Sequence, residues 1–216
     1  GPEIGVASTK AFTAQVLAAI LLAVRLGRAK GALSADAAGG LLGAARQLPN
    51  QAEGMLTTAA RESIAEIARR HAAAKGFLFL GRGVSFPIAL EGALKLKEIS
   101  YVHAEGYAAG EMKHGPIALI DPGMTIVCLN GSSPLSEKMR SNVEQVRARG
   151  GVVLSVGSDP ETHALATDVV EVPETHPLLA PILQVIPLQL FSYFVADLRG
   201  CDIDKPRNLA KSVTVE

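Results

Sequence analysis

The sequence predicts an α/β fold with three layers, in which helices cover both faces of a parallel sheet. From about residue 77 onward, short apolar runs alternate with helical stretches, and parallel strands require such crossover helices. The 216 residues, 48% of them hydrophobic, are enough to bury roughly 70% of the surface of the unfolded chain. A single large core with a covered sheet therefore fits this chain.

The first 70 residues read as helical throughout. Residues 7–30 predict one helix because apolar side chains recur at helical spacing, and the segment ends in the basic turn RLGRAKG. Residues 34–40, SADAAGG, predict a linker. Residues 41–70 predict one or two further helices that are interrupted around Pro49.

The alternating part of the chain supplies the sheet. Four apolar runs predict strands, at residues 77–80, 125–129, 152–156 and 169–172. Helices are expected between or after them, at residues 85–100, 134–149 and 179–198, and residues 101–116 predict a loop. The last helix includes a charge-free stretch, residues 177–196, long enough to span a bilayer. Its three prolines and polar residues favour a buried helix of the α/β layer instead.

Charge and cysteine usage exclude several classes of protein. Lys plus Arg and Asp plus Glu both number 21, so no net field favours nucleic acid or an anionic membrane. Cys128 and Cys201 fit neither a disulfide framework nor a CxxC metal site. A reducing, cytoplasmic setting is expected, and the abrupt opening GPEIGVASTKAF suggests a fragment.

Chemistry is concentrated in residues 91–116, EGALKLKEISYVHAEGYAAGEMKHGP. Glu91, Lys95 and Glu98 fall within an arc of about 60° on one helix face. A carboxylate between a lysine and apolar walls has its pKa tuned in opposite directions by desolvation and by the cation, which suits a general base. The alternative is an exposed Glu91–Lys95 ion pair on a solvated face.

Two loops add candidates. His114 would end a short helix and exchange protons near neutral pH, or else simply pack at that helix end. The Glu111-x-x-His114 spacing occurs in metal sites built from two such copies, and because there is one copy here no metal is predicted.

The turn Gly81-Arg82-Gly83, after the first strand, either meets a phosphate or is a plain tight turn.

The last segment, residues 201–216, has no amphipathic period and contains Pro206, so composition predicts a frayed tail. Lys211 is the exception within it. Held in a pocket by a folded-back tail, a lysine can form an imine with a sugar carbonyl or donate a proton to the ring oxygen.

Three long strings, EIGVASTKAFTAQV, ALEGALKLKEISYVHAEGYAAGEMKHGPIALID and CDIDKPRNLAKSVTVE, resemble the isomerase half of the glutamine:fructose-6-phosphate aminotransferase family. The resemblance runs along the whole chain and implies the sugar isomerase (SIS) fold. It implies that residues 1–68 are the helical end of a first SIS domain with connecting helices. Residues 69–200 would then form a second SIS domain, and residues 201–216 an active-site tail.

The resemblance also implies roles for particular residues. Glu98 matches the base that moves a proton between C1 and C2 of the sugar, and Lys95 matches its lysine companion. His114 matches a ring-opening histidine supplied by the neighbouring subunit, which implies a homodimer. Lys211 matches the tail lysine credited with ring opening or a transient Schiff base. Three positions match residues that line the sugar: Val6, Ser8 and Ala210.

The implied reaction converts fructose 6-phosphate and glutamine-derived ammonia to glucosamine 6-phosphate, without a metal or organic cofactor. The implied partner is a glutaminase domain, which is absent from this sequence together with the phosphate-gripping loop of the first SIS domain. The chain alone is therefore expected to be inactive. The alternative is a non-enzymatic SIS module that binds sugar phosphates or mediates dimerisation.

Overall fold

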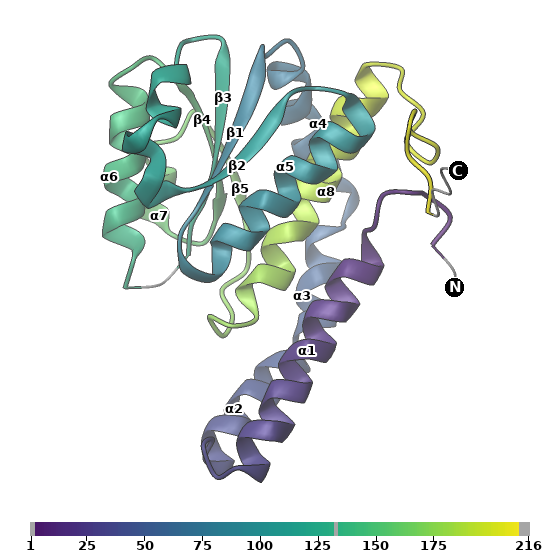
Figure 1. Ribbon diagram of the computed structural model, residues 1–216, viewed down its shortest axis with the longest axis vertical. Helices are drawn as coiled ribbons and strands as arrows, with labels where there is room; N and C mark the ends of the chain where they lie inside the picture. The colour runs from purple at the N-terminus through teal and green to yellow at the C-terminus, as the bar shows by residue number, and fades with distance from the viewer. Residues whose placement is uncertain (1–2, 132–133, 212–216) are drawn as a thin grey trace, which may run out of the picture.

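The computed structural model describes residues 3–131 and 134–211, and it has helices on both faces of a five-stranded parallel sheet (Figure 1). The strand order is β2-β1-β3-β4-β5. The predicted α/β class with a parallel sheet is confirmed. The strands are β1 (Gly76–Gly81), β2 (Ala104–Ala108), β3 (Met124–Leu129), β4 (Val152–Gly157) and β5 (Asp168–Glu171).

One face of the sheet carries the long helices α4 (Thr58–His71), α5 (Phe86–Ser100) and α8 (Ala180–Leu198), with α8 packed against both others (Figure 1). The other face carries the shorter elements. They are α6 (Ser136–Arg147), α7 (Pro160–His163) and the 3-10 helices η2 (Ala109–His114) and η3 (Pro116–Leu119). A further 3-10 turn, η1 (Gly83–Ser85), leads into α5.

Strand β1 shows why the sheet is covered on both sides. All six of its residues are buried. Phe77 and Phe79 belong to the core under α5 and α8, while Leu78 and Leu80 belong to the core under α6. Because successive side chains point to opposite faces, a continuous apolar run is what a doubly covered strand requires.

The N-terminal helices α1 (Lys10–Ala29), α2 (Ala35–Ala45) and α3 (Leu48–Met55) extend away from the sheet, and α1 and α2 form a hairpin (Figure 1). The linker predicted at residues 34–40 is wrong, because α2 begins there. Ser34 accepts a hydrogen bond from the Ala37 backbone N–H at 3.1 Å and caps the helix. Pro49 lies in the first turn of α3, which confirms the predicted interruption.

The loop predicted at residues 101–116 is also wrong in part, because it contains β2 and η2. The sequence AEGYA has little β-propensity of its own, so pairing with β1 and packing under α5 decide its conformation. Gly106 permits that packing, since a Cβ there would lie 2.7 Å from the Cα of Leu90. The strand thus depends on contacts that the local pattern does not reveal.

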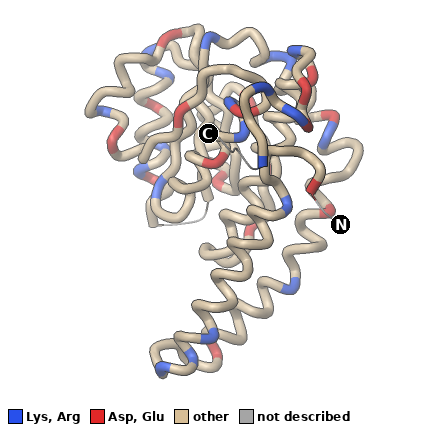
Figure 2. Tube along the Cα trace, turned by 45° about the vertical axis from the view of Figure 1, so that its right-hand side comes forward, with Lys and Arg blue, Asp and Glu red and all other residues tan. Residues whose placement is uncertain are grey.

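Among the described residues, α1 and α8 are long and apolar enough to cross a membrane by length and composition. Within α8, 61% of the apolar window is buried, so the predicted buried helix is confirmed. In α1 only 6% of the apolar window is buried, and Leu21, Leu22 and Leu26 are exposed. Figure 2 shows few charges along the middle of this hairpin. Its apolar surface therefore resembles a packing face rather than a solvated one.

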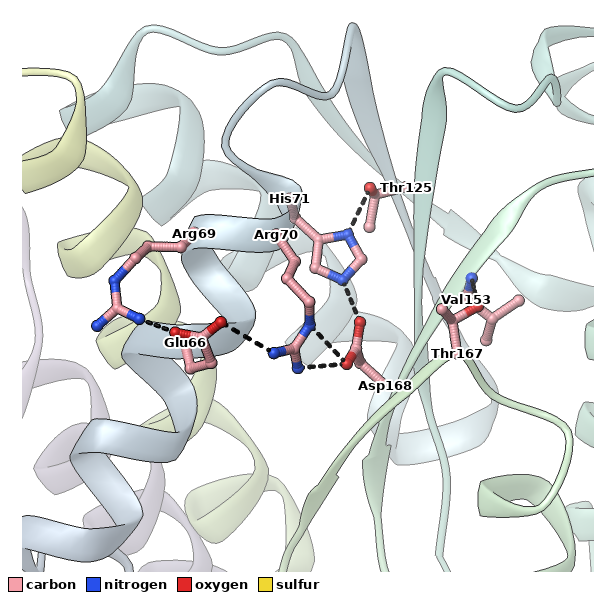
Figure 3. A network of polar contacts seen from close by, with 8 residues as sticks. All are labelled: Glu66, Arg69, Arg70, His71, Thr125, Val153, Thr167 and Asp168. Atoms are coloured by element: carbon pink, nitrogen blue, oxygen red, sulfur yellow. Dashed lines mark hydrogen bonds and ion pairs between the residues drawn. The ribbon is translucent and has the colours of Figure 1, made fainter.

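A buried polar network joins α4 to the amino-terminal ends of β3 and β5 (Figure 3). His71 lies 2.9 Å from Thr125 Oγ1 through Nδ1 and 2.8 Å from Asp168 Oδ2 through Nε2. Arg70 donates to the other Asp168 oxygen, at 3.1 Å from Nε. We call His71, Thr125, Asp168 and Arg70 the His71 network; at its edge Glu66 pairs with Arg69 and Arg70.

Candidate active site

Helix α5 brings Glu91, Lys95 and Glu98 together as the spacing predicts. Lys95 Nζ lies 2.7 Å from Glu98 Oε2 and 3.5 Å from Glu91 Oε1. The three side chains, which we call the Lys95 cluster, are only 5% (Lys95), 11% (Glu91) and 20% (Glu98) exposed. The alternative of a solvated ion-pair face is therefore wrong, and the charges lie in a desolvated environment.

The carboxylates of the Lys95 cluster keep unused hydrogen-bonding capacity. Among the described residues, Glu91 Oε1 and Glu98 Oε2 are buried and have no partner other than the Lys95 ammonium. Desolvation raises the pKa of Glu91, and the positive charge of Lys95 only partly offsets this. Buried carboxylate oxygens that share a single partner are suited to accept a further hydrogen bond from a bound molecule.

Lys95 opens onto a cavity of about 370 Å³ between α5, α8 and the two ends of the described chain. Glu91 and Glu98 contact Lys95 but do not themselves line the cavity. The lining comes from four separate segments and includes Glu3, Thr9, Lys95, Gln189, Tyr193 and Asp204. Two lysines (Lys10 and Lys95), two carboxylates (Glu3 and Asp204) and apolar walls thus surround a space large enough for a small molecule.

The described part of the tail, residues 201–211, is folded against the domain, so the predicted frayed tail is wrong there. Arg207 N donates to the Tyr101 hydroxyl at 2.8 Å, and its guanidinium lies 4.1 Å from the centre of the Tyr101 ring. Pro206 is buried. The remaining tail residues, 212–216, and residues 1–2 of the predicted first domain lie outside the described residues.

The tail returns to the N-terminal segment, where the predicted sugar-lining positions lie. Val6 N donates to Asp204 O at 2.9 Å, and Lys211 Nζ lies 3.7 Å from Glu3 Oε2. Val6 and Ser8 are half-buried, and Ala210 is exposed. Lys211 and Val6 thus contact Glu3 and Asp204, which line the cavity, while Val6, Ser8, Ala210 and Lys211 do not line it themselves.

His114 does not line this cavity. It ends η2, as predicted, and its side chain is 75% exposed, 4.0 Å from Glu111 Oε2. In the part of the chain that the structure describes, no group of three or more His, Cys, Asp or Glu side chains is arranged to hold a metal ion. His114 is accessible for contact with another molecule.

The Gly81-Arg82-Gly83 turn borders a second cavity, of about 340 Å³, beyond the carboxyl ends of the strands. Arg82 donates to Asn142 Oδ1 at 3.1 Å from Nε and 2.9 Å from Nη2, and Ser85 donates to Gln184 Oε1 at 2.8 Å. Gly81 allows a close approach, since a Cβ there would lie 2.3 Å from the Ser85 carbonyl oxygen. These internal bonds favour a tight turn over a phosphate site.

Sequence reasoning missed Glu3, which lines the cavity beside Lys95 and pairs with Lys211. It also missed Gln189, Tyr193 and Asp204 on the opposite walls. One signal was available for Glu3: a carboxylate shortly before a predicted helix start is a candidate cap for that helix. Nothing in the sequence pattern indicated that the other three residues face α5.

Comparison with known proteins places this architecture in a family. The SIS domain model matches residues 72–196, more than half of the chain. Two curated proteins named glutamine–fructose-6-phosphate aminotransferase (isomerizing), from Thermus thermophilus and Pseudomonas putida, are 58% and 52% identical over all of this chain. The chain spans 36% and 35% of their lengths, respectively.

Solved structures agree. The C-terminal domain of glucosamine-fructose-6-phosphate aminotransferase from Francisella tularensis superposes with a TM-score of 0.89 at 39% identity, covering 95% of this chain and 58% of that one. Glucosamine-6-phosphate deaminase from Thermotoga maritima shares the fold, with a TM-score of 0.72 at 24% identity, over 100% of this chain and 60% of that one. The chain belongs to the SIS domain family.

Proposed function

We propose that this chain is the C-terminal isomerase portion of a glutamine:fructose-6-phosphate aminotransferase. The observation that carries the proposal is the Lys95 cluster, a buried carboxylate, lysine and carboxylate beside a cavity. The names of the curated relatives and the 58% identity to one of them support it. The protein would act in the cytoplasm.

The proposed chemistry is a proton transfer on an open-chain sugar. Ammonia adds to the C2 carbonyl of fructose 6-phosphate with loss of water, which gives an imine. Glu98 removes a proton from C1 while the imine nitrogen takes up a proton, which gives the enolamine. A proton is then added at C2 and the O1 hydroxyl loses its proton, which leaves the aminated aldose glucosamine 6-phosphate. Within the described residues the only partner of Glu98 Oε2 is the Lys95 ammonium, so the carboxylate keeps lone pairs to take this proton. Lys95 balances its charge before the transfer.

The remaining roles need more than one segment or subunit. Lys211, at the end of the docked tail, would open the sugar ring by proton donation or a transient Schiff base. Val6, Ser8 and Ala210 would line the sugar. The exposed His114, which does not line the cavity beside Lys95, would serve the site of a second copy in a homodimer.

The rest of the full-length enzyme would cover and supply this part. The exposed apolar surface of α1 would pack against the portion that precedes residue 1, consistent with residues 1–68 being the end of a first SIS domain. A glutaminase domain would provide the ammonia. No cofactor is needed for these steps, and the chain alone would be inactive.

The central test is Glu98→Gln in the full-length enzyme. The variant should slow exchange of the C1 or C2 hydrogen with solvent by at least about 100-fold, the usual contribution of a positioned base. Glutamine hydrolysis should stay near the unmodified rate. Glu111→Gln, which alters an exposed carboxylate near His114, is the matched control for charge loss. Undiminished exchange in Glu98→Gln would remove this residue from the role of base.

A second candidate function is a non-enzymatic SIS module that binds sugar phosphates or only dimerises. Calorimetric titration of this chain with glucosamine 6-phosphate separates the two. The proposal expects weak binding or none, because the phosphate-gripping loop belongs to the missing domain. Micromolar affinity, together with unaltered exchange in the Glu98→Gln enzyme, would favour the sensor.

A further inference from the structure

Glu3 has two separate sets of partners, one on each carboxylate oxygen. Oε1 accepts from the backbone N–H of Thr9 at 2.8 Å, the Thr9 hydroxyl at 2.9 Å and the backbone N–H of Ala11 at 3.4 Å. Thr9, the residue that precedes α1, makes no side-chain cap of its own, so Glu3 caps the helix from six residues upstream. A carboxylate at this end of a helix is also favoured by the helix dipole.

The second oxygen of Glu3 faces the tail. Oε2 lies 3.7 Å from Lys211 Nζ, and the Glu3 side chain is only 13% exposed. The hydrogen bond from the Thr9 backbone, with smaller contributions from the Thr9 hydroxyl, Ala11 and Lys211, lowers the pKa of Glu3 to about 2 against the opposing effect of burial. Glu3 is therefore ionised at neutral pH, and its position is fixed by α1 rather than by the tail.

Glu3 also lines the cavity onto which Lys95 opens. Glu3 thus contacts Lys211 of the tail and lines the same cavity as Lys95 of α5. Close by, Val6 N bonds to Asp204 O at 2.9 Å, so backbone and side chain hold the tail at the same place. The N-terminal segment and the tail are thus held together there by the Glu3–Lys211 ion pair and the Val6–Asp204 backbone hydrogen bond.

We propose that Glu3 is a positioning residue that anchors Lys211 at the mouth of the cavity lined by Lys95. The catalytic consequence of this inference rests on the proposed function, whereas the Glu3–Lys211 pairing does not depend on it. Glu3 acts through Lys211 rather than on the sugar. Removing its charge releases the lysine while leaving the fold of α1 in place.

The test is Glu3→Gln, because the amide oxygen of glutamine still accepts the α1 hydrogen bonds but carries no charge. The first readout is independent of activity: limited acylation of this chain, with labelling of each lysine followed by mass spectrometry. Lys211 should be labelled several-fold faster in Glu3→Gln, while Lys205, on the same tail, should keep its rate. Ser34→Ala, which removes the cap of α2, is the matched control and should alter neither.

The second readout uses the full-length enzyme. Glu3→Gln should lower kcat for isomerisation by about tenfold, since a misplaced reacting group costs up to about 100-fold, with a smaller change in KM. Unchanged labelling of Lys211 overturns the pairing whatever the enzyme does. Faster labelling with an unchanged kcat, in an enzyme that Glu98→Gln inactivates, overturns the positioning role. If Glu98→Gln leaves isomerisation intact, the proposed function has failed, and the labelling still decides the pairing.

Discussion

The His71 network and the Lys95 cluster are both largely buried polar groups, with Arg70 as the half-exposed member of the first, and they differ in how many of their polar atoms have hydrogen-bond partners. In the His71 network both oxygens of Asp168 and both ring nitrogens of His71 have partners. In the Lys95 cluster Glu91 Oε1 and Glu98 Oε2 share one partner among the described residues, the Lys95 ammonium. The first group holds α4 to the sheet; the second keeps capacity for a ligand.

The two groups also respond to pH in opposite directions. Burial lowers the pKa of His71 against the opposing effect of Asp168, so the folded state favours the neutral ring and stability rises as pH increases toward about 6.5. Burial raises the pKa of Glu91, so the ionised form is disfavoured and stability falls as pH increases above about 4.5. Substitutions in each group therefore test the comparison.

The largest effect is expected from Lys95→Met. Removing the cation leaves two buried carboxylates without compensation, which should lower the free energy of unfolding by about 3 kcal/mol at neutral pH. Because Lys95 lowers the pKa of Glu91, its loss raises that pKa further, and mild acid should restore part of the stability. Urea denaturation at two pH values measures this. The exposed neighbour Lys97→Met is the control, and equal losses in both variants would contradict the buried cluster.

A somewhat smaller loss is expected from His71→Leu. Asp168 Oδ2 would lose its hydrogen bond to the ring while its side chain stays 11% exposed, which should lower the free energy of unfolding by about 2 kcal/mol. The rise of stability toward pH 6.5 should disappear as well. Denaturation across this range checks both, with the exposed His103→Leu as control. If the free energy of unfolding of His71→Leu still rose toward pH 6.5, His71 would not be the cause of that rise.

Glu91→Gln should have a smaller effect of opposite sign. Neutralising a buried carboxylate whose Oε1 makes no hydrogen bond among the described residues should raise the free energy of unfolding by up to about 1 kcal/mol at neutral pH. The gain should shrink as pH falls toward 4.5, where the wild-type carboxyl also becomes neutral. Thermal midpoints across this range measure it, with the exposed Glu137→Gln as control. A loss of stability at neutral pH would mean that the Glu91 carboxylate is stabilised in the folded state by more interactions than its contacts indicate.

The smallest effect is expected at the edge of the His71 network. Arg69 pairs with Glu66, but both side chains are more than half exposed, at 55% and 51%. Arg69→Ala should change the free energy of unfolding by less than about 1 kcal/mol, and less still at high salt. Urea denaturation at low and high salt measures the change. A loss as large as that of His71→Leu would show that the network extends to the surface.

Much of the fold was predictable because periodicity is a local property. The apolar runs of β1, β3 and β4 and the helical spacing of α5 specify their own conformations. Strand β2 was missed because AEGYA becomes a strand only by pairing with β1. The first half of helix α2 was missed because its glycines suggested a linker over residues 34–40, while its Ser34 cap and tertiary contacts outweigh that preference.

The candidate site was predictable to a similar extent. Helical geometry placed Glu91, Lys95 and Glu98 on one face, and the family resemblance assigned roles to Lys95 and Glu98, which remain predictions. Neither could establish that this face is buried. The closure of α8, the N-terminal segment and the tail over α5 decides it.

By itself, the sequence determined the order of most helices and strands, the alignment of charges along α5 and the membership of the family. Only the tertiary structure decided which charges are desolvated and that Glu3 meets Lys211. The physical reason is that periodicity depends on neighbouring residues, whereas the desolvation of a charge depends on segments far away in the chain.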